Sequence, residues 1–453
     1  MIPFPHQVEG SKFLAERTFA ILGDEPRVGK TGTAIMAADT VGAKSLLVVT
    51  TASGRGVWRR AFDDWSIMGR DVAVMTSVEI KPAAVTIIGW PTLTRRPGYR
   101  LPLLQREWDV LILDEAHFGK SFEAARTRVV YGDLDNDGAA LLRRMALTQR
   151  AKRVWCLTGT PMPNSPFDLY PMLRAGAAGR LLADPDKGWP NVTLQGSFKA
   201  RYCQVKPKKI GHGYMARWID VIVGGKNLEE LRERCEGLIL RRTQQDVGIR
   251  PPIYETMPLV ITRPQRHAIA QAAKDVQGVL AAIDSGSTKD MEMHLGPLRR
   301  LTGGMKADAI VQAITDEFES GLDRVVLAYW HREVAEKLIE GLSQFGVVGI
   351  DGATPPAKRD ANVAAFQSGK ARVFLGQIAA AGEAIDLSAA AELIFVESSF
   401  IPAQMKQMSL RVTNHTQTRQ VRVRVATLDG SIDDAIQSSL LRKWSAINEV
   451  LTP

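Results

Sequence analysis

The sequence predicts an α/β protein in which two parallel-sheet lobes flank a mainly helical segment. In the first part of the chain, short apolar runs rich in β-branched residues alternate with stretches of helical spacing. Such strands, separated by helices, are typical of parallel sheets that are buried on both faces. The runs that predict strands in the first lobe are 45–51, 85–90, 109–117 and 153–161.

The alternation stops in the middle of the chain and returns later. Residues 164–302 are basic and helix-like, and within them 227–243 carries apolar residues at roughly helical spacing. We therefore expect a first lobe over 1–165, a helical insertion and linker over 166–303, and a second lobe over 304–453. The runs that predict strands in the second lobe are 324–331, 347–352, 372–377, 392–399 and 421–428.

The composition is that of a basic globular protein. Lys and Arg outnumber Asp and Glu by 58 to 49 in 453 residues, which gives a formal net charge of +9. This excess favours a polyanionic partner, with a basic enzyme that has no such partner as the alternative. No apolar run approaches the roughly 18 residues of a membrane span, and the N-terminus resembles no leader. We expect a cytoplasmic protein that does not bind membranes.

Residues 24–31, DEPRVGKT, raise the question of a phosphate-binding loop. The Gly-Lys-Thr ending at 29–31 matches the pattern of such loops. However, Asp24 replaces the first glycine, and Arg27 stands where a small residue would let the backbone approach a phosphate. A chance Gly-Lys-Thr is the alternative reading.

The sequence around the loop supports a nucleotide site. An apolar run at 18–23 precedes the loop, and a helical pattern at 31–39 follows it. A helix that begins at this point offers free backbone N–H groups to a phosphate. We predict that Lys30 contacts the β- and γ-phosphates of ATP and that the Thr31 hydroxyl holds magnesium.

A pair of acidic residues completes the predicted chemistry. Asp114 and Glu115 directly follow the apolar run VLIL, at the end of a predicted strand. Asp114 is suited to coordinate magnesium, and Glu115 to orient or deprotonate the attacking water. The order and strand context of the two motifs make a chance coincidence of Gly-Lys-Thr and Asp-Glu-Ala-His improbable.

Eight short segments follow the motif order of a known family. They are PHQ (5–7), DEPRVGKT (24–31), LLVVTTASGRGVWRRAF (46–62), LILDEAHFGKSFEAARTR (111–128), LTGTPMPNSPFDLY (157–170), LILRRTQQDV (238–247), GQIAAAGEAIDLSAA (376–390) and PAQMKQMSLRVTNHTQ (402–417). With them the chain resembles the Swi/Snf-type ATPases of helicase superfamily two. The segment GSFKARYCQ is similar to the annealing-helicase branch. The family's phosphate loop itself begins Asp-Glu, which accounts for Asp24.

The resemblance implies two RecA-like lobes that close on ATP and magnesium and reopen after hydrolysis. It also implies a motor that moves along double-stranded or forked DNA without reading its sequence. Catalytic roles fall on Lys30, Asp114, Glu115 and Arg411. Nucleotide contacts fall on Gln7, Asp24, Glu25, Pro26, Arg27, Val28, Gly29, Lys30, Thr31, Gly382, Asp386 and Gln407.

The same resemblance implies residues that couple the nucleotide to DNA. They are Thr50, Thr51, His117, Thr158, Gly159 and Thr160. The two threonines of Thr-Gly-Thr could instead serve a strand-ending turn. Lys206 to Lys209, KPKK, and the arginine pairs at 241–242 and 299–300 are further candidates for backbone contacts to DNA, with a solvated charged surface as the alternative.

The segment at 402–417 departs from the family pattern. Gln407 and Arg411 fall in place, but Asn414 occupies the position of a second arginine, which in the family stabilises charge on the transferring phosphate. This leaves three readings: a slow or inactive ATPase, compensation by Arg411 alone, or compensation by Arg419 or a partner. We expect an active but slow motor, which Asn414→Arg should accelerate.

The functional prediction is an ATP-driven double-stranded DNA translocase that remodels or reanneals DNA. A strand-separating helicase and a DNA-binding scaffold with little turnover are the alternatives. The chain starts and ends close to its motifs, so we expect a bare motor that is targeted by itself or by a protein partner. Compact motors with an arginine in this loop resemble those encoded by bacteriophages. Arg27 points outward or touches the nucleotide.

Overall fold

The structure, a computed structural model, has two compact units, Met1–Thr243 and Gln244–Pro453. The unit boundary divides the predicted middle segment, 166–303, between them; the three predicted segments stay a prediction. The structure describes residues 1–52, 54–75, 83–95, 97–132, 146–159, 161–162, 165–176, 187, 189–210, 217–260, 262–272, 288–381, 385–399 and 402–428.

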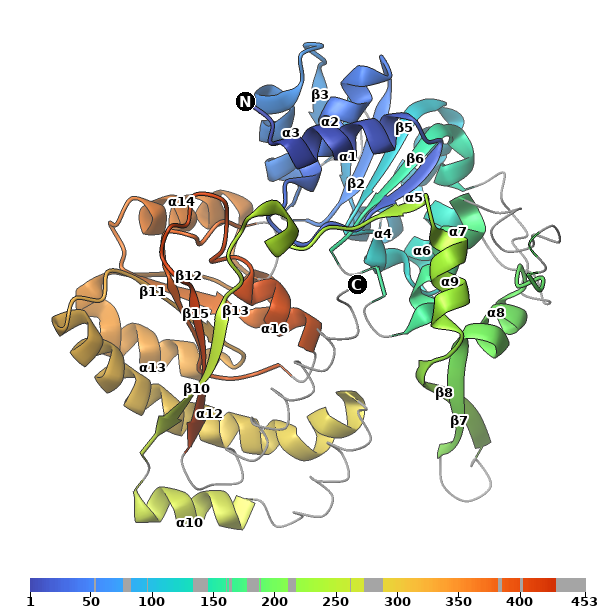
Figure 1. Ribbon diagram of the computed structural model, residues 1–453. Helices are drawn as coiled ribbons and strands as arrows, with labels where there is room; N and C mark the ends of the chain where they lie inside the picture. Colours follow the sequence, from blue (N-terminus) through green and yellow to red (C-terminus); the bar gives the residue numbers. More distant parts are fainter. Residues whose placement is uncertain are drawn as a thin grey trace. The chain divides into compact units, whose positions relative to one another are not determined.

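The first unit is built on a seven-stranded sheet in the order β3-β4-β2-β5-β6-β1-β9, and every pairing in it is parallel (Figure 1). This confirms the parallel sheet that the sequence predicts. The strands are β1 (Phe19–Leu22), β2 (Leu46–Thr50), β3 (Val72–Val74), β4 (Val85–Gly89), β5 (Trp108–Asp114), β6 (Ala151–Leu157) and β9 (Ile239–Leu240).

Helices cover both faces of this sheet. Successive residues of a strand point to opposite sides, and here the residues on both sides are apolar. In β1, Phe19 and Ile21 join one apolar core, whereas Ala20 and Leu22 join the other. The second of these cores packs against α1 (Pro5–Ala15), α2 (Lys30–Thr40) and α3 (Gly54–Trp65). The first packs against α4 (Trp90–Arg95), α5 (Pro97–Gln105), α6 (Ala125–Tyr131), α7 (Tyr170–Gly176), α8 (Gln195–Tyr202) and α9 (Leu228–Cys235).

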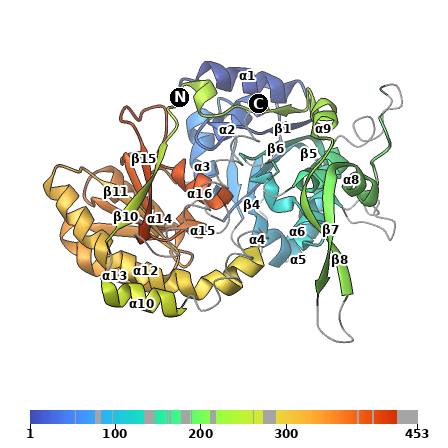
Figure 2. The same ribbon diagram turned by 60° about the horizontal axis from the view of Figure 1, so that its bottom comes forward.

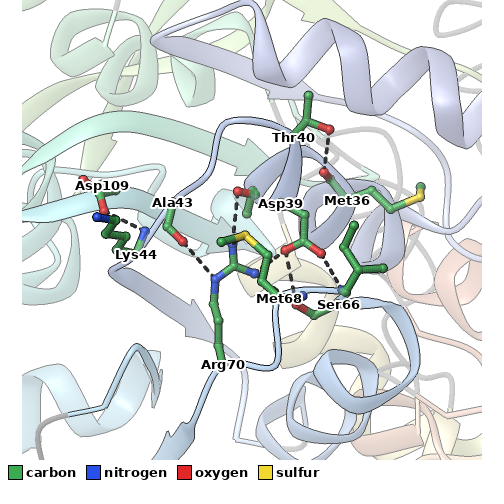
Figure 3. Close-up of polar contacts among 11 residues, drawn as sticks. Met36, Asp39, Thr40, Ala43, Lys44, Ser66, Met68, Arg70 and Asp109 are labelled. Carbon is green, nitrogen blue, oxygen red and sulfur yellow. Dashed lines mark hydrogen bonds and ion pairs between the residues drawn. The ribbon is translucent and has the colours of Figure 1, made fainter.

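A buried ion pair fixes the end of α2 to the chain that follows α3 (Figure 3). Arg70 pairs with Asp39, and its Nε donates to the Ala43 carbonyl at 2.9 Å. Asp39 also accepts a hydrogen bond from the Ile67 backbone N–H at 2.7 Å. These contacts fix the helix whose opposite end forms the phosphate loop.

An antiparallel hairpin extends from the first unit. Its strands are β7 (Cys203–Ile210) and β8 (Arg217–Gly225), with an irregularity between Gln204 and Val205. In both ribbon views the two strands run away from the seven-stranded sheet (Figures 1 and 2). The middle segment contains helices as expected, among them α8, α9 and α10 (Arg263–Ala272), with the hairpin in addition to them. The helical spacing read over 227–243 is only partly correct, because the helix α9 ends at Cys235 and Ile239–Leu240 forms the strand β9.

The second unit contains a six-stranded sheet in the order β10-β15-β14-β11-β13-β12, again with every pairing parallel. All five strands predicted for this lobe are confirmed, and β10 adds a sixth at one edge. The strands are β10 (Ile253–Leu259), β11 (Val325–Tyr329), β12 (Val347–Ile350), β13 (Val373–Gln377), β14 (Glu392–Phe395) and β15 (Arg422–Leu428).

Two apolar cores again lie on opposite faces of this sheet. One joins Val325 and Leu327 to α10 (Arg263–Ala272), α12 (Thr288–Glu319) and α13 (Arg332–Leu342). The other joins Val326 and Ala328 to α14 (Pro356–Gln367), α15 (Ile378–Ala381) and α16 (Pro402–Ser409). Within the described part of the chain, every helix is too short or too polar to cross a membrane.

Candidate active site

The predicted phosphate loop lies between β1 and the N-terminus of α2. Gly29 is the residue that precedes the helix, and its φ of 101° lies in the left-handed region that glycine tolerates. Lys30 and Thr31 open the helix, where the first N–H groups have no partner within the helix itself. Arg27 also has a positive φ of 72°, which is strained for a residue with a side chain.

Gln7 supports the loop from α1. Its Nε2 donates to the Gly29 carbonyl at 3.3 Å, and its Oε1 accepts from the Phe4 backbone N–H at 2.9 Å. A Cβ on Gly29 would collide with the Gln7 amide, so glycine is required there for a second reason. His6 adds a hydrogen bond of 2.9 Å to the Val28 carbonyl. The adenine contact predicted for Gln7 stays a prediction.

Asp24 is held by an arginine that is distant in the sequence. Arg242 follows β9, and its Nε and Nη2 contact the two Asp24 carboxylate oxygens at 3.1 and 2.6 Å. Asp24 is only 1% exposed, and the Glu25 backbone N–H donates to the Arg242 carbonyl at 2.9 Å. Arg242 therefore binds the phosphate loop. Its side chain is buried, so the structure does not support the DNA contact expected for it.

Lys30 spans the mouth of the loop. Its Nζ donates to the carbonyls of Asp24 at 2.6 Å and Glu25 at 3.1 Å. Lys30 and Thr31 are both partly exposed, as residues that meet a ligand must be. The ammonium group, the helix N-terminus and the left-handed Gly29 fit a bound triphosphate.

Asp114 ends β5 beside this loop. Its Oδ2 accepts hydrogen bonds from the Thr50 hydroxyl at 2.7 Å and from Trp58 Nε1 at 2.8 Å, and Trp90 Nε1 donates to its carbonyl at 2.8 Å. Burial raises the pKa of Asp114, and the Glu115 carboxylate adds to the increase. The two side-chain hydrogen bonds and nearby Lys30 oppose it.

The buried Asp114 carboxylate, next to the carboxylate of Glu115, is suited to a magnesium ion. A cation there would offset the cost of ionising a desolvated carboxylate. Mg²⁺ keeps several waters and takes only one or two protein carboxylates together with substrate phosphates. No group of three or more His, Cys, Asp or Glu side chains that could hold a metal ion occurs among the described residues. The magnesium ligands expected from the sequence, Thr31 and Asp114, stay a prediction.

Glu115 adopts an unusual backbone and leads into a chain of polar contacts. Its φ of 50° lies in the left-handed region, at the start of the short 3-10 helix Ala116–Gly119. His117 Nδ1 lies 3.3 Å from Glu115 Oε2 and 3.0 Å from Thr158 Oγ1. The Thr158 backbone N–H donates to the Leu22 carbonyl at 3.1 Å, at the end of the strand that precedes the phosphate loop.

The remaining predicted coupling residues have different environments. A Cβ on Gly159 would lie 2.8 Å from Pro26 Cδ, so these two segments are in close contact. Thr50 is buried and hydrogen-bonded to Asp114, whereas the Thr51 hydroxyl accepts the Gly54 backbone N–H at 3.0 Å and so supports α3. Thr160 lies outside the described residues.

In the second unit, the predicted nucleotide residues are only partly described. Gly382 lies outside the described residues. Asp386 Oδ1 accepts hydrogen bonds from the Ser388 backbone N–H at 3.0 Å and hydroxyl at 2.7 Å. Arg411 is buried, and its carbonyl accepts the Leu387 N–H at 3.0 Å. Gln407 is partly exposed on α16.

Asn414 is part of a polar turn in this unit. Its Nδ2 donates to Ser388 Oγ at 2.5 Å, and its Oδ1 accepts from the Thr416 backbone N–H at 2.8 Å and hydroxyl at 2.9 Å. An arginine at this position would lose the two hydrogen bonds that Oδ1 accepts, because a guanidinium has no acceptor. The structure thus gives Asn414 a role in holding this turn. The sequence pattern had indicated only that Asn414 lacks the charge of an arginine.

Sequence reasoning missed several supporting residues. Trp90 gave no signal, because it is the last residue of the predicted strand 85–90. Arg242 appeared as one half of a basic pair. A buried acid in the loop, Asp24, was the signal that could have predicted a buried cationic partner. Among the other predicted DNA contacts, Arg299 is buried and Arg300 is ion-paired with Glu333.

The fold and the site together define a RecA-like nucleotide-binding protein with two parallel-sheet units. Two family comparisons agree with this class. The SNF2-related domain matches residues 6–301, and the helicase conserved C-terminal domain matches residues 305–416. The first match spans more than half of the chain, and the protein therefore belongs to the SNF2-related family.

Curated relatives match the whole chain at modest identity. One is the SWI/SNF-related matrix-associated actin-dependent regulator of chromatin subfamily A-like protein 1 of Xenopus tropicalis, 27% identical over 98% of this chain and 44% of its own length. Another is the DNA annealing helicase and endonuclease ZRANB3 of Bos taurus, 24% identical over 99% of this chain and 40% of its own length. The chain thus spans less than half the length of these relatives.

A solved structure also aligns with the chain. The Sulfolobus solfataricus SWI2/SNF2 ATPase core in complex with dsDNA covers 99% of this chain and 92% of its own, with 19% identity and a TM-score of 0.43. The fold assignment rests on the two parallel sheets described above.

Proposed function

We propose that this protein is an ATP-driven double-stranded DNA translocase that remodels or reanneals DNA. The observation that carries the proposal is that the phosphate loop, the N-terminus of α2 and the end of β5 lie close together in the first unit. Lys30 begins α2 beside a left-handed Gly29, and Asp114 ends β5 within the electrostatic influence of Lys30. This is the arrangement that nucleotide hydrolysis with magnesium requires.

The chemistry proposed for each residue follows from its surroundings. Bound magnesium would neutralise charge on the phosphates. Lys30 and the N–H groups of α2 would hold the β- and γ-phosphates. Glu115, directly after the magnesium ligand Asp114, would accept a proton from the attacking water. His117, which contacts both Glu115 and Thr158, would transmit the state of the phosphate site.

DNA as the substrate is supported by the family and by the charge. The relatives named above include one whose name is DNA annealing helicase and endonuclease. The net charge of +9 favours a polyanion that is bound through its backbone. Forked DNA as the preferred form, a protein partner for targeting, and a bacteriophage source stay predictions.

The experiment that tests the proposal is ATP hydrolysis by the purified protein. Turnover is measured without nucleic acid, and with single strands, linear duplex and forked DNA of equal length. We expect duplex and forked DNA to stimulate turnover most. Lys30→Ala should abolish turnover and leave DNA binding largely intact, because it removes the phosphate contact and two hydrogen bonds within the phosphate loop, and no contact with DNA is assigned to Lys30.

The outcomes separate the proposed function from its alternatives. A translocase without strand separation should displace a triplex-forming strand from duplex DNA and should anneal forked strands. Release of a strand from plain duplex would instead indicate an unwinding helicase. DNA binding with no stimulated turnover in the wild type would indicate a scaffold. Normal turnover in Lys30→Ala would rule out the site described here.

A further inference from the structure

The hairpin β7–β8 presents a large aromatic side chain to solvent. Trp218 is 67% exposed. Four other tryptophans, Trp58, Trp90, Trp108 and Trp155, are at most 1% exposed. Tryptophan supplies much of the packing energy of protein cores, so one left on a projecting strand is an unusual use of the residue.

The hairpin also concentrates positive charge. Residues 203–225 contain four basic residues and one acidic residue, Asp220. Three of the basic residues, Lys206, Lys208 and Lys209, lie on β7. In the backbone register Lys209 is paired with Trp218, and the Lys206 side chain is exposed. Aromatic and cationic residues on one narrow element are what base stacking and phosphate contact require together.

The base of the hairpin is firmly anchored in the first unit. Tyr202, immediately before β7, donates its hydroxyl to Glu230 at 2.6 Å, and the same carboxylate pairs with Arg201 and with buried Arg234. The Lys226 backbone N–H, immediately after β8, donates to the Tyr202 carbonyl at 2.9 Å.

Close packing on the β8 side completes this anchor. A Cβ on Gly225 would lie 2.8 Å from Leu228 Cδ2 and 3.0 Å from Pro166 Cγ. A two-stranded hairpin is marginal by itself, and anchoring at its base lowers the entropy lost when its strands bind a ligand.

We propose that the hairpin β7–β8 binds DNA where base pairing ends, with Trp218 stacked on the first exposed base and the positive charge of β7 facing the flanking phosphates. This inference rests on the proposed DNA translocase and names the DNA feature that it engages. The charge complements a polyanion. Within a continuous duplex every base face is covered by its neighbours, so an exposed indole finds a free face at a junction or an end.

The test compares forked DNA with linear duplex of the same length at one salt concentration. A 2-aminopurine base is placed at the first unpaired position, and affinity is measured by fluorescence anisotropy. We expect Trp218→Ala to weaken fork binding about tenfold, with linear duplex changed less than about twofold. Trp218→Phe should retain most of the fork affinity. The control is Ile67→Ala, which removes another exposed apolar side chain of the same unit.

Charge is tested separately. Lys206→Glu combined with Lys209→Glu should weaken fork binding more than Lys12→Glu combined with Lys44→Glu, which makes the same change in net charge elsewhere. Unchanged thermal melting of each variant would show that the effects are not due to unfolding.

Several results would overturn the inference. One is an equal loss on forked and linear DNA in Trp218→Ala, and another is a 2-aminopurine signal that the wild type does not alter. A third is self-association that Trp218→Ala abolishes without changing fork affinity, which would make the hairpin a contact between copies. If no DNA stimulates wild-type ATP hydrolysis while Trp218→Ala still loses fork binding, the translocase fails and the hairpin inference stands.

Discussion

At the residue scale, the candidate site consists of a few side chains with divided tasks. Lys30 and Thr31 are partly exposed, whereas Gln7, Asp24 and Thr50 are buried and bonded to the protein itself. The sequence motif includes both groups without distinguishing them. Residue type and spacing thus predict which positions form the site, but only the hydrogen bonds separate ligand-facing residues from supporting ones.

Glu115→Gln tests the proposed base. Glutamine keeps the size of the side chain and its hydrogen-bonding capacity but cannot accept the proton from water. We expect nucleotide binding to persist and DNA-stimulated hydrolysis to fall by roughly 10²-fold or more. Binding is followed with a fluorescent ATP analogue, and hydrolysis by phosphate release. Loss of nucleotide binding would show instead that Glu115, with its positive φ, serves the structure of the turn.

Asp114→Asn tests the raised pKa of Asp114, the proposed magnesium ligand. The unfolded chain ionises this carboxyl near pH 4, whereas the folded protein holds its proton to higher pH. Stability is therefore lost as pH rises from the unfolded pKa to the folded one, and stays lower above it. Asparagine cannot ionise, so without nucleotide the variant should be more stable than the wild type at neutral pH.

The measurement is urea denaturation of both proteins between about pH 4 and pH 7, without nucleotide. The advantage of Asp114→Asn should grow across this range, while magnesium-dependent ATP hydrolysis is lost. A variant that is less stable than the wild type at every pH would mean that the hydrogen bonds from Thr50 and Trp58 outweigh the cost of burying the charge.

At the element scale, the strands were predictable and the additions to them were not. β11 to β15 follow apolar runs, because a strand buried on both faces leaves a continuous apolar signature. The hairpin was not recognised, since Pro207 is unusual within a strand and the lysines around it indicate a solvated surface. β9 contains two residues, too few for any periodicity.

The structure explains why so short a strand exists. β9 pairs with β1 and brings Arg242 to Asp24. This long-range contact joins residues more than two hundred positions apart, so local sequence patterns carry no trace of it.

Arg242→Ala tests the importance of this contact. Removing the guanidinium leaves the Asp24 carboxylate buried without its cation, which typically costs about 3–5 kcal/mol. We expect a lower urea midpoint for the first unit and weaker nucleotide binding, because the loop loses its support. In a matched variant, Asp24→Asn with Arg242→Met, stability should recover in large part. Equal destabilisation of both variants would mean that the lost hydrogen bonds of the guanidinium to Asp24 and to the His6 carbonyl, which neither variant replaces, rather than an uncompensated charge, are responsible.

At the scale of the whole molecule, the sequence predicted two parallel-sheet units, and both are present. Of the nucleotide residues predicted in the second unit, Asp386, Gln407 and Arg411 are described, and Gly382 lies outside the described residues. Charge is the property of the whole chain that bears on function. It sums to +9, but no base-reading motif was found in the sequence, so the charge predicts affinity for DNA without sequence preference.

Binding to DNA should accordingly weaken steeply with salt and depend little on sequence. Each phosphate neutralised by Lys or Arg releases counterions, so the logarithm of the binding constant falls linearly with the logarithm of salt concentration. Affinity is measured by anisotropy from about 50 to 200 mM KCl on three unrelated duplexes of equal length. The three slopes should be parallel, and the affinities should agree within about tenfold. A difference above roughly a hundredfold between duplexes exceeds what most single base contacts provide and would reveal direct base recognition.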